Sequence, residues 1–221
     1  MRYWFALFLS SLTLVYPSTA EARETPLQLS SDPHPTTSSP LQLYGGVRTR
    51  AIIIQWYLAE LDVPYQYISL DIASGENLKP EFLAINPIGR IPAIVHGDLK
   101  LWEPGAILLY LANLYQPTSD LQEQGKLYQW VLFANTSLAP GLFIPERRTK
   151  EIPRLLSPLE KIFSQQQFLL GDKLTVADVA VGSYLYYAQS IFQFNLSQYP
   201  AIVAYIERLA ARPAFAATLS P

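Results

Sequence analysis

A cluster of charged and hydroxyl side chains, Arg48-Thr49-Arg50, lies between an alternating segment and an apolar helical segment. Two guanidinium groups and a hydroxyl beside a helix N-terminus create a local positive field, which lowers the pKa of a thiol bound next to it. Lowering that pKa from about 8.5 to about 6.5 requires roughly 2.7 kcal/mol of preference for the thiolate, which one or two charged hydrogen bonds supply. The alternative interpretation is structural: Arg48 and Arg50 are surface charges and Thr49 is a helix N-cap.

A second segment, Gly89-Arg90-Ile91-Pro92, places a proline at the start of a short predicted strand. The proline can be purely structural, because the first residue of a strand need not donate to the ladder. If the bond were cis, as in about 5–6% of X–Pro bonds, the N–H and C=O of Ile91 would stand unpaired at an exposed rim. An extended peptide ligand could then pair with them like an added strand. Spacing alone favours the structural interpretation.

The third segment, Trp102-Glu103-Pro104-Gly105, opens a predicted helix. Pro104 suits the first helical position, because the N–H that it lacks would be unpaired there. One interpretation makes Glu103 an ordinary carboxylate stabilised by the helix dipole, worth ~0.3–1 kcal/mol. In the other, Glu103 receives a ligand ammonium while N–H groups at the helix start hold a ligand carboxylate. The segment by itself favours the first.

Composition excludes several other chemistries. The 221 residues contain no Cys, which excludes disulfides, thiolate metal sites and catalysis by a protein thiol. Two histidines, His34 and His96, are too few for a His-rich metal centre. The net charge of −2 argues against nucleic acid as the main partner, since phosphate binding needs a basic surplus. Half of the residues are hydrophobic, which is enough to bury a sizeable core.

The first forty residues differ from the rest of the chain. Arg2, an apolar run over 3–16 and small residues up to Ala22 are typical of an export signal. The run is too short for a transmembrane helix, which needs about 20 apolar residues. Residues 23–40, rich in Pro, Ser and Thr, indicate a flexible linker without a fold. We therefore expect a signal peptide over 1–22 and a periplasmic location; the alternatives are a misassigned start or an incidental apolar tail on a cytoplasmic protein.

Periodicity and turn signals predict the elements that position these segments. The first half has the order strand, helix, strand, helix, strand, strand, helix, over residues 41–45, 49–61, 65–71, 76–85, 92–95, 100–102 and 104–115. Two strong turn signals, Asn86-Pro87-Ile88-Gly89 and His96-Gly97-Asp98, precede and connect the last two strands.

The second half, after a boundary at 116–118, is predicted to be helical throughout. Helices are expected over 121–139, 152–167, 175–189 and 199–212, with Pro140-Gly141 ending the first and Pro213 the last. Thr175 and Asp178 form a variant of the capping box before an apolar run. Because that run is apolar almost all round, its helix should be the buried centre of this half. The charged stretch 146–150 predicts a solvated loop.

Together these motifs resemble a cytosolic-type glutathione S-transferase. The resemblance runs from about Leu41 to Pro213 and is carried by residues 86–92, 102–107 and 174–178. Residues 44–51 and 55–58 resemble the chi-type enzymes of photosynthetic bacteria most. The resemblance implies a thioredoxin-like α/β domain with the order βαβαββα over 41–117, which binds glutathione. It also implies an all-helical domain over 118–221 that walls a hydrophobic co-substrate pocket.

The family pattern also implies roles for individual residues. Pro92 would be the family's cis-proline, with Ile91 pairing the cysteinyl part of glutathione, which reverses the structural interpretation given above. Glu103 would hold the γ-glutamyl ammonium, and Arg90 would help to grip the tripeptide. Thr175 and Asp178 match the family's folding cap. For the co-substrate pocket we expect three aromatic residues of the helical domain: Tyr128, Phe133 and Tyr187.

The chain departs from the family pattern at two places. Many members follow the glutamate with Ser, whose hydroxyl and N–H hold the γ-glutamyl carboxylate. Pro104 offers neither, so glutathione should bind more weakly unless the N–H of Gly105 substitutes. The family usually activates the thiol with Tyr, Ser or Cys just after the first strand, where this chain has Thr49 and Arg50, and Tyr44 should face away. We therefore expect Arg48, Thr49 and Arg50 to stabilise the thiolate jointly.

The expected activity is conjugation of glutathione to small hydrophobic electrophiles, or reduction of organic hydroperoxides. Mixed-disulfide chemistry needs a protein thiol, whereas conjugation needs only an oriented glutathione thiolate. Glutathione is then a co-substrate; we expect no cofactor, metal, nucleic-acid partner or membrane span in the mature chain, and by resemblance a homodimer. The alternative is a non-catalytic binding or scaffold protein. Pro104 and the absence of the activating Tyr, Ser or Cys favour this alternative. The intact Gly89–Pro92 segment and Glu103 favour the enzyme.

Overall fold

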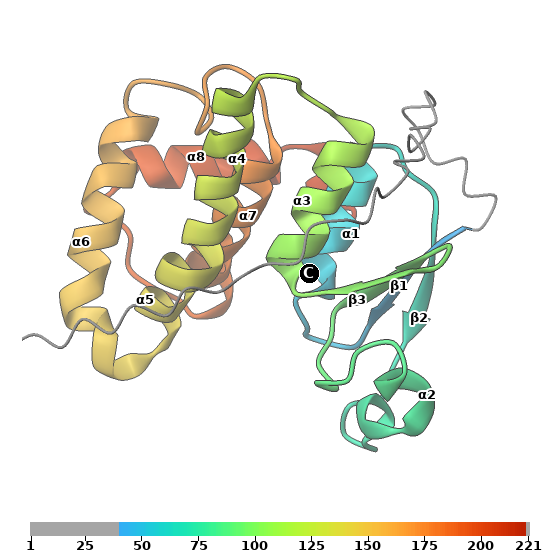
Figure 1. The fold of residues 1–221 in the computed structure, drawn as a ribbon. Coiled ribbons are helices and arrows are strands. Elements are labelled where there is room, and N and C mark those ends of the chain that lie inside the picture. Colours follow the sequence, from blue (N-terminus) through green and yellow to red (C-terminus); the bar gives the residue numbers. More distant parts are fainter. Residues whose placement is uncertain (1–39, 220–221) are drawn as a thin grey trace, which may run out of the picture. The chain divides into compact units, whose positions relative to one another are not determined.

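The structure, a computed structural model, describes residues 40–219 (Figure 1). The expected signal peptide, His34 and all but the last residue of the expected linker lie outside the described residues. The first half contains the elements β1 (Leu41–Gly45), α1 (Ala51–Glu60), β2 (Tyr65–Ser69), the 3-10 turn η1 (Glu76–Leu78), α2 (Pro80–Leu83), β3 (Ala93–His96), β4 (Leu99–Trp102) and α3 (Pro104–Tyr115). This order confirms the predicted thioredoxin-like topology.

A four-stranded mixed sheet in the order β2-β1-β3-β4 organises the first half. β1 pairs in parallel with β2, where Leu43 faces Tyr67, and antiparallel with β3, where Leu43 faces Ile94. Leu41 and Leu43 are buried in the core that α1 and α3 also enter. Tyr44, on the opposite side of the strand, lies against Phe82 of α2 with ring centroids 5.8 Å apart. Tyr44 thus points away from α1, as the alternation of the strand predicts.

Helices form the second half. They are α4 (Leu121–Phe133), α5 (Ala139–Phe143), α6 (Pro145–Phe163), α7 (Val176–Tyr186), α8 (Pro200–Ala210) and α9 (Pro213–Ala216), with π-helical turns η2 (Ala134–Leu138) and η3 (Tyr187–Ile191) after α4 and α7. Every residue of α7 is buried, which confirms that it is the centre of this half. It packs against α4 and α8 and also against α1 and α3 of the first half (Figure 1). None of the helices within 40–219 combines the length and hydropathy needed to cross a membrane.

Prolines account for the main differences from the predicted helices. The helix expected over 76–85 divides at Lys79, which is extended because the residue before a proline avoids helical angles. Pro140, expected to end a helix, does not end it. The π-helical turn η2 changes the direction of the chain, and Pro140 lies in the first turn of α5, where a proline is tolerated. The expected loop over 146–150 is the start of α6, which continues through Pro153 and Pro158. Burial of its apolar face, Leu155, Leu156, Leu159 and Phe163, offsets the lost backbone hydrogen bonds.

The carboxylate of Asp178 fastens the start of α7. Its Oδ1 accepts hydrogen bonds from the N–H of Leu169 (2.8 Å) and the hydroxyl of Tyr205 (3.0 Å). Its Oδ2 accepts from the N–H (2.9 Å) and the hydroxyl (3.0 Å) of Thr175. Burial raises the pKa of Asp178, and these hydrogen bonds oppose the rise. The predicted capping role is confirmed, and it extends to the loop before α7 and to α8.

An ion pair joins the first half of the protein to the second. Arg212 forms a two-pronged ion pair with Glu60 at the end of α1, at 2.8 and 2.7 Å, and the indole N–H of Trp56 donates to the same carboxylate at 2.8 Å. Beside it, Trp56 meets Phe215 of α9 edge to face, with centroids 4.8 Å apart. Bidentate pairs of this kind restrict geometry as well as adding energy, so α1 is held in a fixed relation to the C-terminal helices.

We predict that Asp178→Asn lowers the free energy of unfolding by about 2–3 kcal/mol, because the new amide NH2 must face one of the donors that the carboxylate now satisfies. Urea denaturation followed by circular dichroism measures the change. Asp172→Asn is the matched control, since Asp172 lies exposed in the turn before α7. Equal stability of the two variants would contradict the role assigned to Asp178.

Candidate active site

The loop after β1 is closed by the hydroxyl of Thr49. This hydroxyl donates to the carbonyl of Gly46 at 2.9 Å and accepts from the N–H groups of Gly46 (3.3 Å) and Ala51 (3.4 Å). Its proton is therefore directed at the backbone. Arg48 is exposed, with a positive φ of 57°, whereas Arg50 is half-buried at the start of α1. Of the three residues expected to stabilise a thiolate, Arg50 is the one whose charge affects the pKa of tyrosines in the helical half.

The charge of Arg50 acts on two tyrosines of the helical half, the buried Tyr184 and the half-buried Tyr187. Burial raises the pKa of Tyr184, a hydrogen bond and the charge of Arg50 lower it, and the charge of Glu103 raises it. Burial also raises the pKa of Tyr187, where Tyr184 adds to the rise and Arg50 opposes it. The charges at the starts of α1 and α3 thus act on tyrosines of the helical half, and α1 and α3 both pack against α7.

The turn before β3 is fastened by two asparagines. Asn86 is 1% exposed, and its side chain donates to the carbonyl of Arg90 at 2.6 Å and accepts from the N–H of Ile88 at 3.0 Å. Asn77 donates to the carbonyl of Gly89 at 2.7 Å. The Ile91–Pro92 peptide bond is cis, Pro92 is buried, and the Arg90 side chain is exposed. Among the described residues, no backbone hydrogen bond engages Ile91.

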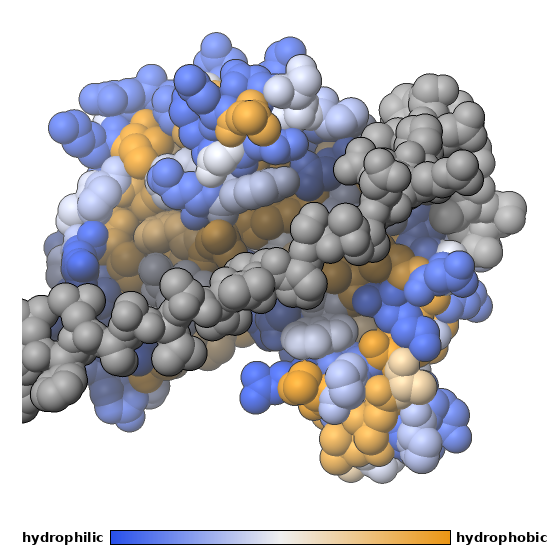
Figure 2. Space-filling model, viewed as in Figure 1, coloured by the Kyte–Doolittle hydropathy of each residue, from blue (hydrophilic) through white to orange (hydrophobic). Residues whose placement is uncertain are grey.

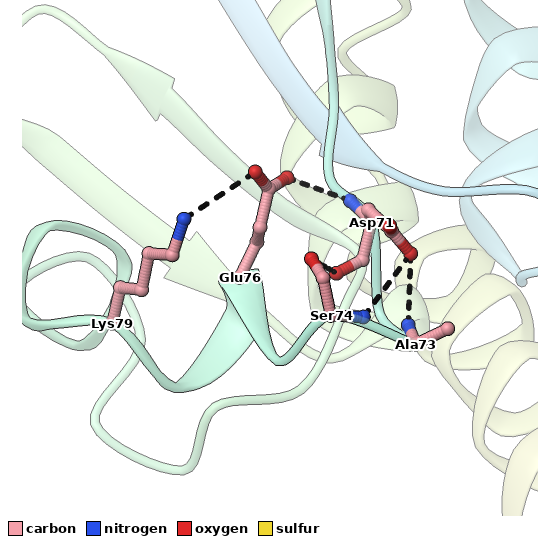
Figure 3. A network of polar contacts seen from close by, with 5 residues as sticks. All are labelled: Asp71, Ala73, Ser74, Glu76 and Lys79. Carbon is pink, nitrogen blue, oxygen red and sulfur yellow. Dashed lines mark hydrogen bonds and ion pairs between the residues drawn. The ribbon is translucent and has the colours of Figure 1, made fainter.

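A network in the segment after β2 supports this turn (Figure 3). The carboxylate of Asp71 accepts from the N–H groups of Ala73 (2.9 Å) and Ser74 (3.3 Å), and the Ser74 hydroxyl donates to the Asp71 carbonyl at 3.0 Å. Glu76 accepts from the N–H of Asp71 at 2.8 Å and pairs with Lys79 at 3.5 Å. The network sets the course of the chain into η1, which supplies the second of the two asparagines.

The start of α3 carries an unusual backbone conformation. Glu103 has φ 72° and ψ 120°, a region that residues other than glycine rarely occupy and that is enriched at functional sites. Its carboxylate is exposed, and its carbonyl accepts the N–H of Ile107. Pro104 is buried at the first helical position, as the sequence predicts. A Cβ at Gly105 would lie 3.2 Å from the amide nitrogen of Asn135, so α3 approaches η2 closely here.

The helical half supplies an aromatic wall that sequence reasoning missed. The ring of Phe143 lies against those of Tyr184, Phe192 and Phe194, with centroid distances of 6.2, 4.7 and 6.4 Å. Phe192 is 50% exposed. The signal in the sequence is the Phe192-Gln193-Phe194 pair directly after the central helix. Its contact with Phe143, far away in the chain, carries no local signature.

The three aromatic residues expected to form the co-substrate pocket have different neighbours. Tyr128 accepts a hydrogen bond from Asn113 at 3.0 Å, where α3 meets α4. Phe133 lines a hollow of about 660 Å³ together with residues of α5 and α6. Tyr187 lies beside Tyr184 near Arg50. Of the three residues, Tyr187 is the one on which the charge of Arg50 acts, and the pocket role of all three stays a prediction.

Comparison with known proteins decides the family. A model described as the N-terminal domain of glutathione S-transferase matches residues 39–113, and one for its C-terminal domain matches 144–220. Glutathione S-transferase 2 of Schizosaccharomyces pombe is 30% identical over an alignment of 198 positions that covers 73% of this chain and 86% of that protein. The chain belongs to the glutathione S-transferase family.

Other relatives within this family carry different names. The disulfide-bond oxidoreductase YfcG of Escherichia coli is 31% identical over an alignment of 186 positions that covers 73% of this chain and 86% of that protein. The structure of Ure2p in complex with S-hexylglutathione superimposes with a TM-score of 0.74 at 27% identity, covering 82% of this chain and 98% of that one. In Saccharomyces cerevisiae, URE2 is named a transcriptional regulator. Members of this family thus share a fold while their names describe different tasks.

We predict that Gly46→Ala destabilises the protein by about 1–3 kcal/mol, because the added Cβ would lie 2.7 Å from the carbonyl oxygen of Leu70 and 3.2 Å from the Ile91 side chain. Gly125→Ala serves as the control in the same urea titration. Gly125 is exposed in α4 with open space at its Cβ position, so this change should stabilise slightly. If Gly46→Ala left the free energy of unfolding unchanged or increased it, the close packing around Gly46 would be refuted.

Proposed function

We propose that this protein is a glutathione transferase that stabilises the thiolate of bound glutathione with Arg50 and conjugates it to small hydrophobic electrophiles. The carrying observation lies in two segments of the thioredoxin-like half: Ile91, before the cis Pro92, takes part in no backbone hydrogen bond among the described residues, and Glu103 lies exposed at the start of α3. In this proposal Arg50 supplies the cation for the thiolate, Glu103 the anion for the ligand ammonium, and aromatic side chains of the helical half the apolar wall.

In this proposal two segments of the first half bind glutathione: the turn before β3 and the start of α3. The backbone of Ile91, which Pro92 and the carbonyl of Arg90 hold in place, pairs with the cysteinyl part of the tripeptide. Glu103 receives the γ-glutamyl ammonium, and the N–H of Gly105 takes the carboxylate that Pro104 cannot bind. The side chain of Arg90 adds a cation at the exposed end. The structures of Ure2p in complex with glutathione and with S-hexylglutathione, to which this chain is similar, support this proposal.

Catalysis requires a lower thiol pKa and a positioned electrophile. Arg50 is the principal cation, with Arg48 adding to the field and Thr49 fixing the loop through Gly46. The resulting thiolate attacks an electrophile held against Phe143, Tyr187 and Phe192, so the rate gain comes from ionisation and proximity. Because the sequence contains no Cys, the reacting sulfur is that of glutathione. Reduction of organic hydroperoxides uses the same thiolate.

Three further features belong to the proposal. We assign the protein to the chi type on residues 44–51 and 55–58, with a detoxifying role, and we propose that residues 1–22 direct it to the periplasm.

We also propose a homodimer. The segment around η1 and α2 exposes Ile72, Leu78 and Ile88 by 40%, 62% and 58%, and Figure 2 shows orange surface there, available to a second copy.

A second candidate is a non-catalytic glutathione-binding protein. The hydroxyl of Thr49 donates its hydrogen bond to the Gly46 carbonyl and not to a ligand. Pro104 stands where many members of the family have a serine. One relative is named a transcriptional regulator. Retention on immobilised glutathione followed by an aryl-halide conjugation assay separates the two. Binding with turnover supports the transferase, and binding without turnover supports the second candidate.

We predict that Arg50→Ala lowers kcat/KM for conjugation at pH 6.5 by about 10- to 50-fold and changes the glutathione Kd less than about threefold. This is the loss expected when the thiol pKa returns from about 6.5 toward about 8.5. Steady-state kinetics and calorimetry measure the two effects. Arg154→Ala, on the exposed side of α6, is the control and should retain full activity. Unchanged kinetics in Arg50→Ala would exclude Arg50 as the activating group.

We also predict that Pro104→Ser tightens glutathione binding by about three- to tenfold, because a hydroxyl and an N–H become available to the γ-glutamyl carboxylate at the start of α3, and a net gain of about 1 kcal/mol corresponds to this range. Pro145→Ser makes the same change at the exposed first position of α6 and should leave the Kd unaltered. An unchanged Kd in Pro104→Ser would argue against carboxylate binding at this position.

A further inference from the structure

One arginine of the charged stretch 146–150, Arg148, is held at a hollow beside the aromatic wall. Arg148 is half-buried, whereas the other four residues of the stretch are exposed. Its Nε donates to the carbonyl of Leu142 at 2.9 Å, and its Nη2 donates to the carbonyl of Phe143 at 3.5 Å. Its guanidinium carbon lies 5.0 Å from the centre of the Phe194 ring. These contacts fix the guanidinium between the end of α5 and the segment after η3.

No carboxylate among residues 40–219 neutralises the charge of Arg148. The ion pairs of this range do not include it, and Glu151, three positions further along α6, pairs with Arg154 instead. The two hydrogen bonds to the α5 carbonyls occupy the side of the guanidinium formed by Nε and Nη2. The end formed by Nη1 and Nη2 is left, and its two N–H groups match the two oxygens of a carboxylate.

The hollow at Arg148 has a volume of about 280 Å³. Its lining consists of one cation, one amide and three apolar side chains: Arg148, Asn195, Ile152, Phe194 and Leu196. The Oδ1 of Asn195 accepts a hydrogen bond from the N–H of Ser197 at 3.0 Å, so the NH2 group is the part of the amide that a ligand can use. Both polar side chains of the lining are therefore donors, and an anion with an apolar body matches them.

The segment on the far side of the hollow is fixed by its backbone and by packing. The N–H of Phe194 donates to the carbonyl of Ala188 at 2.8 Å, and the side chain of Leu196 is buried. The ring of Phe194 also lies against Phe143, with centroids 6.4 Å apart. The same ring thus belongs to the hollow and to the aromatic wall against which the proposed function places the electrophile.

We propose that Arg148 and Asn195 bind the carboxylate of a small aromatic acid whose ring packs on Phe194, and that the electrophiles of this protein belong to that class. The proposal rests on the proposed transferase function and adds to it the charge of the co-substrate. The volume of the hollow suits a single ring, since pockets for drug-sized ligands measure about 300–1,000 Å³.

The carboxylate takes no part in the reaction itself. With a chlorinated nitrobenzoate, the glutathione sulfur forms a bond to the ring carbon, chloride leaves with the electron pair of the broken bond, and the thiol proton passes to water. Arg148 therefore determines which electrophile binds and how it is oriented, while the thiolate is stabilised elsewhere.

Two probes of equal size and different charge test the carboxylate site: 3-nitrobenzoate and 3-nitrobenzamide, which lack a leaving group and bind without reacting. We expect the wild type to bind the benzoate about five- to twentyfold more tightly in calorimetry, the gain of a charged hydrogen bond in a half-exposed site. Arg148→Gln should abolish this preference. Asn195→Asp should abolish it too, because it keeps the acceptor for the Ser197 N–H and adds a negative charge. Arg147→Gln, at the neighbouring exposed arginine, is the control and should retain it.

The reacting pair 4-chloro-3-nitrobenzoate and 4-chloro-3-nitrobenzamide tests the link to catalysis. Arg148→Gln and Asn195→Asp should lower kcat/KM for the benzoate about five- to twentyfold and change kcat/KM for the benzamide less than about twofold. The unchanged benzamide reaction also shows that the variants are folded. Arg147→Gln should leave both reactions unchanged.

Equal Kd values of the two non-reacting probes in the wild type, or a preference that persists in both variants, would overturn the carboxylate site. Loss of the binding preference without any loss of kcat/KM for the benzoate would overturn its role in the choice of electrophile. If the wild type conjugates neither probe but binds 3-nitrobenzoate in an Arg148-dependent manner, the carboxylate site is retained and the transferase function is overturned instead.

Discussion

Four hydrogen bonds converge on the buried carboxylate of Asp178, and the position of α7 depends on them. They come from the loop before the helix, from its first turn and from α8, so a displacement of α7 would break contacts with three segments at once. Since every residue of α7 is buried, its rotation is also restricted by packing. Tyr184, further along the same helix, consequently has a fixed place.

The thioredoxin-like half is held to this helix by the ion pair of Glu60 and Arg212 and by the packing of Trp56 against Phe215. Both contacts act on α1, which begins at Arg50 at its other end. The proposed active site therefore depends on how the halves dock: the cation comes from one half and the aromatic side chains from the other. Conjugation, in this account, depends on the junction of the two halves rather than on the loop 46–50 alone.

Local signals in the sequence predict most of the fold, whereas the roles of the site residues stay predictions. The strand order, the cap at Asp178 and the turn before Pro92 are determined by residues that lie close together in the chain, and the structure contains each of them. Contacts within the helical half are less predictable, because Asn135 and Tyr184 are bonded across 49 positions and the π-helical turns shift the helical spacing that periodicity assumes. Tyr128 and Phe133 were expected in the pocket as aromatic residues of the first helix of this half; Tyr128 bonds to Asn113 and Phe133 lines a hollow with residues of α5 and α6.

Because the sequence contains no Cys, the thiol whose ionisation matters is that of the bound ligand, and its pKa is the quantity on which the account rests. Ultraviolet difference spectroscopy of the glutathione complex, titrated with pH in the wild type and in Arg50→Ala, measures it directly. We predict a thiol pKa of about 6.5 in the wild type, rising toward about 8.5 in Arg50→Ala. The same pKa in both proteins would contradict the account.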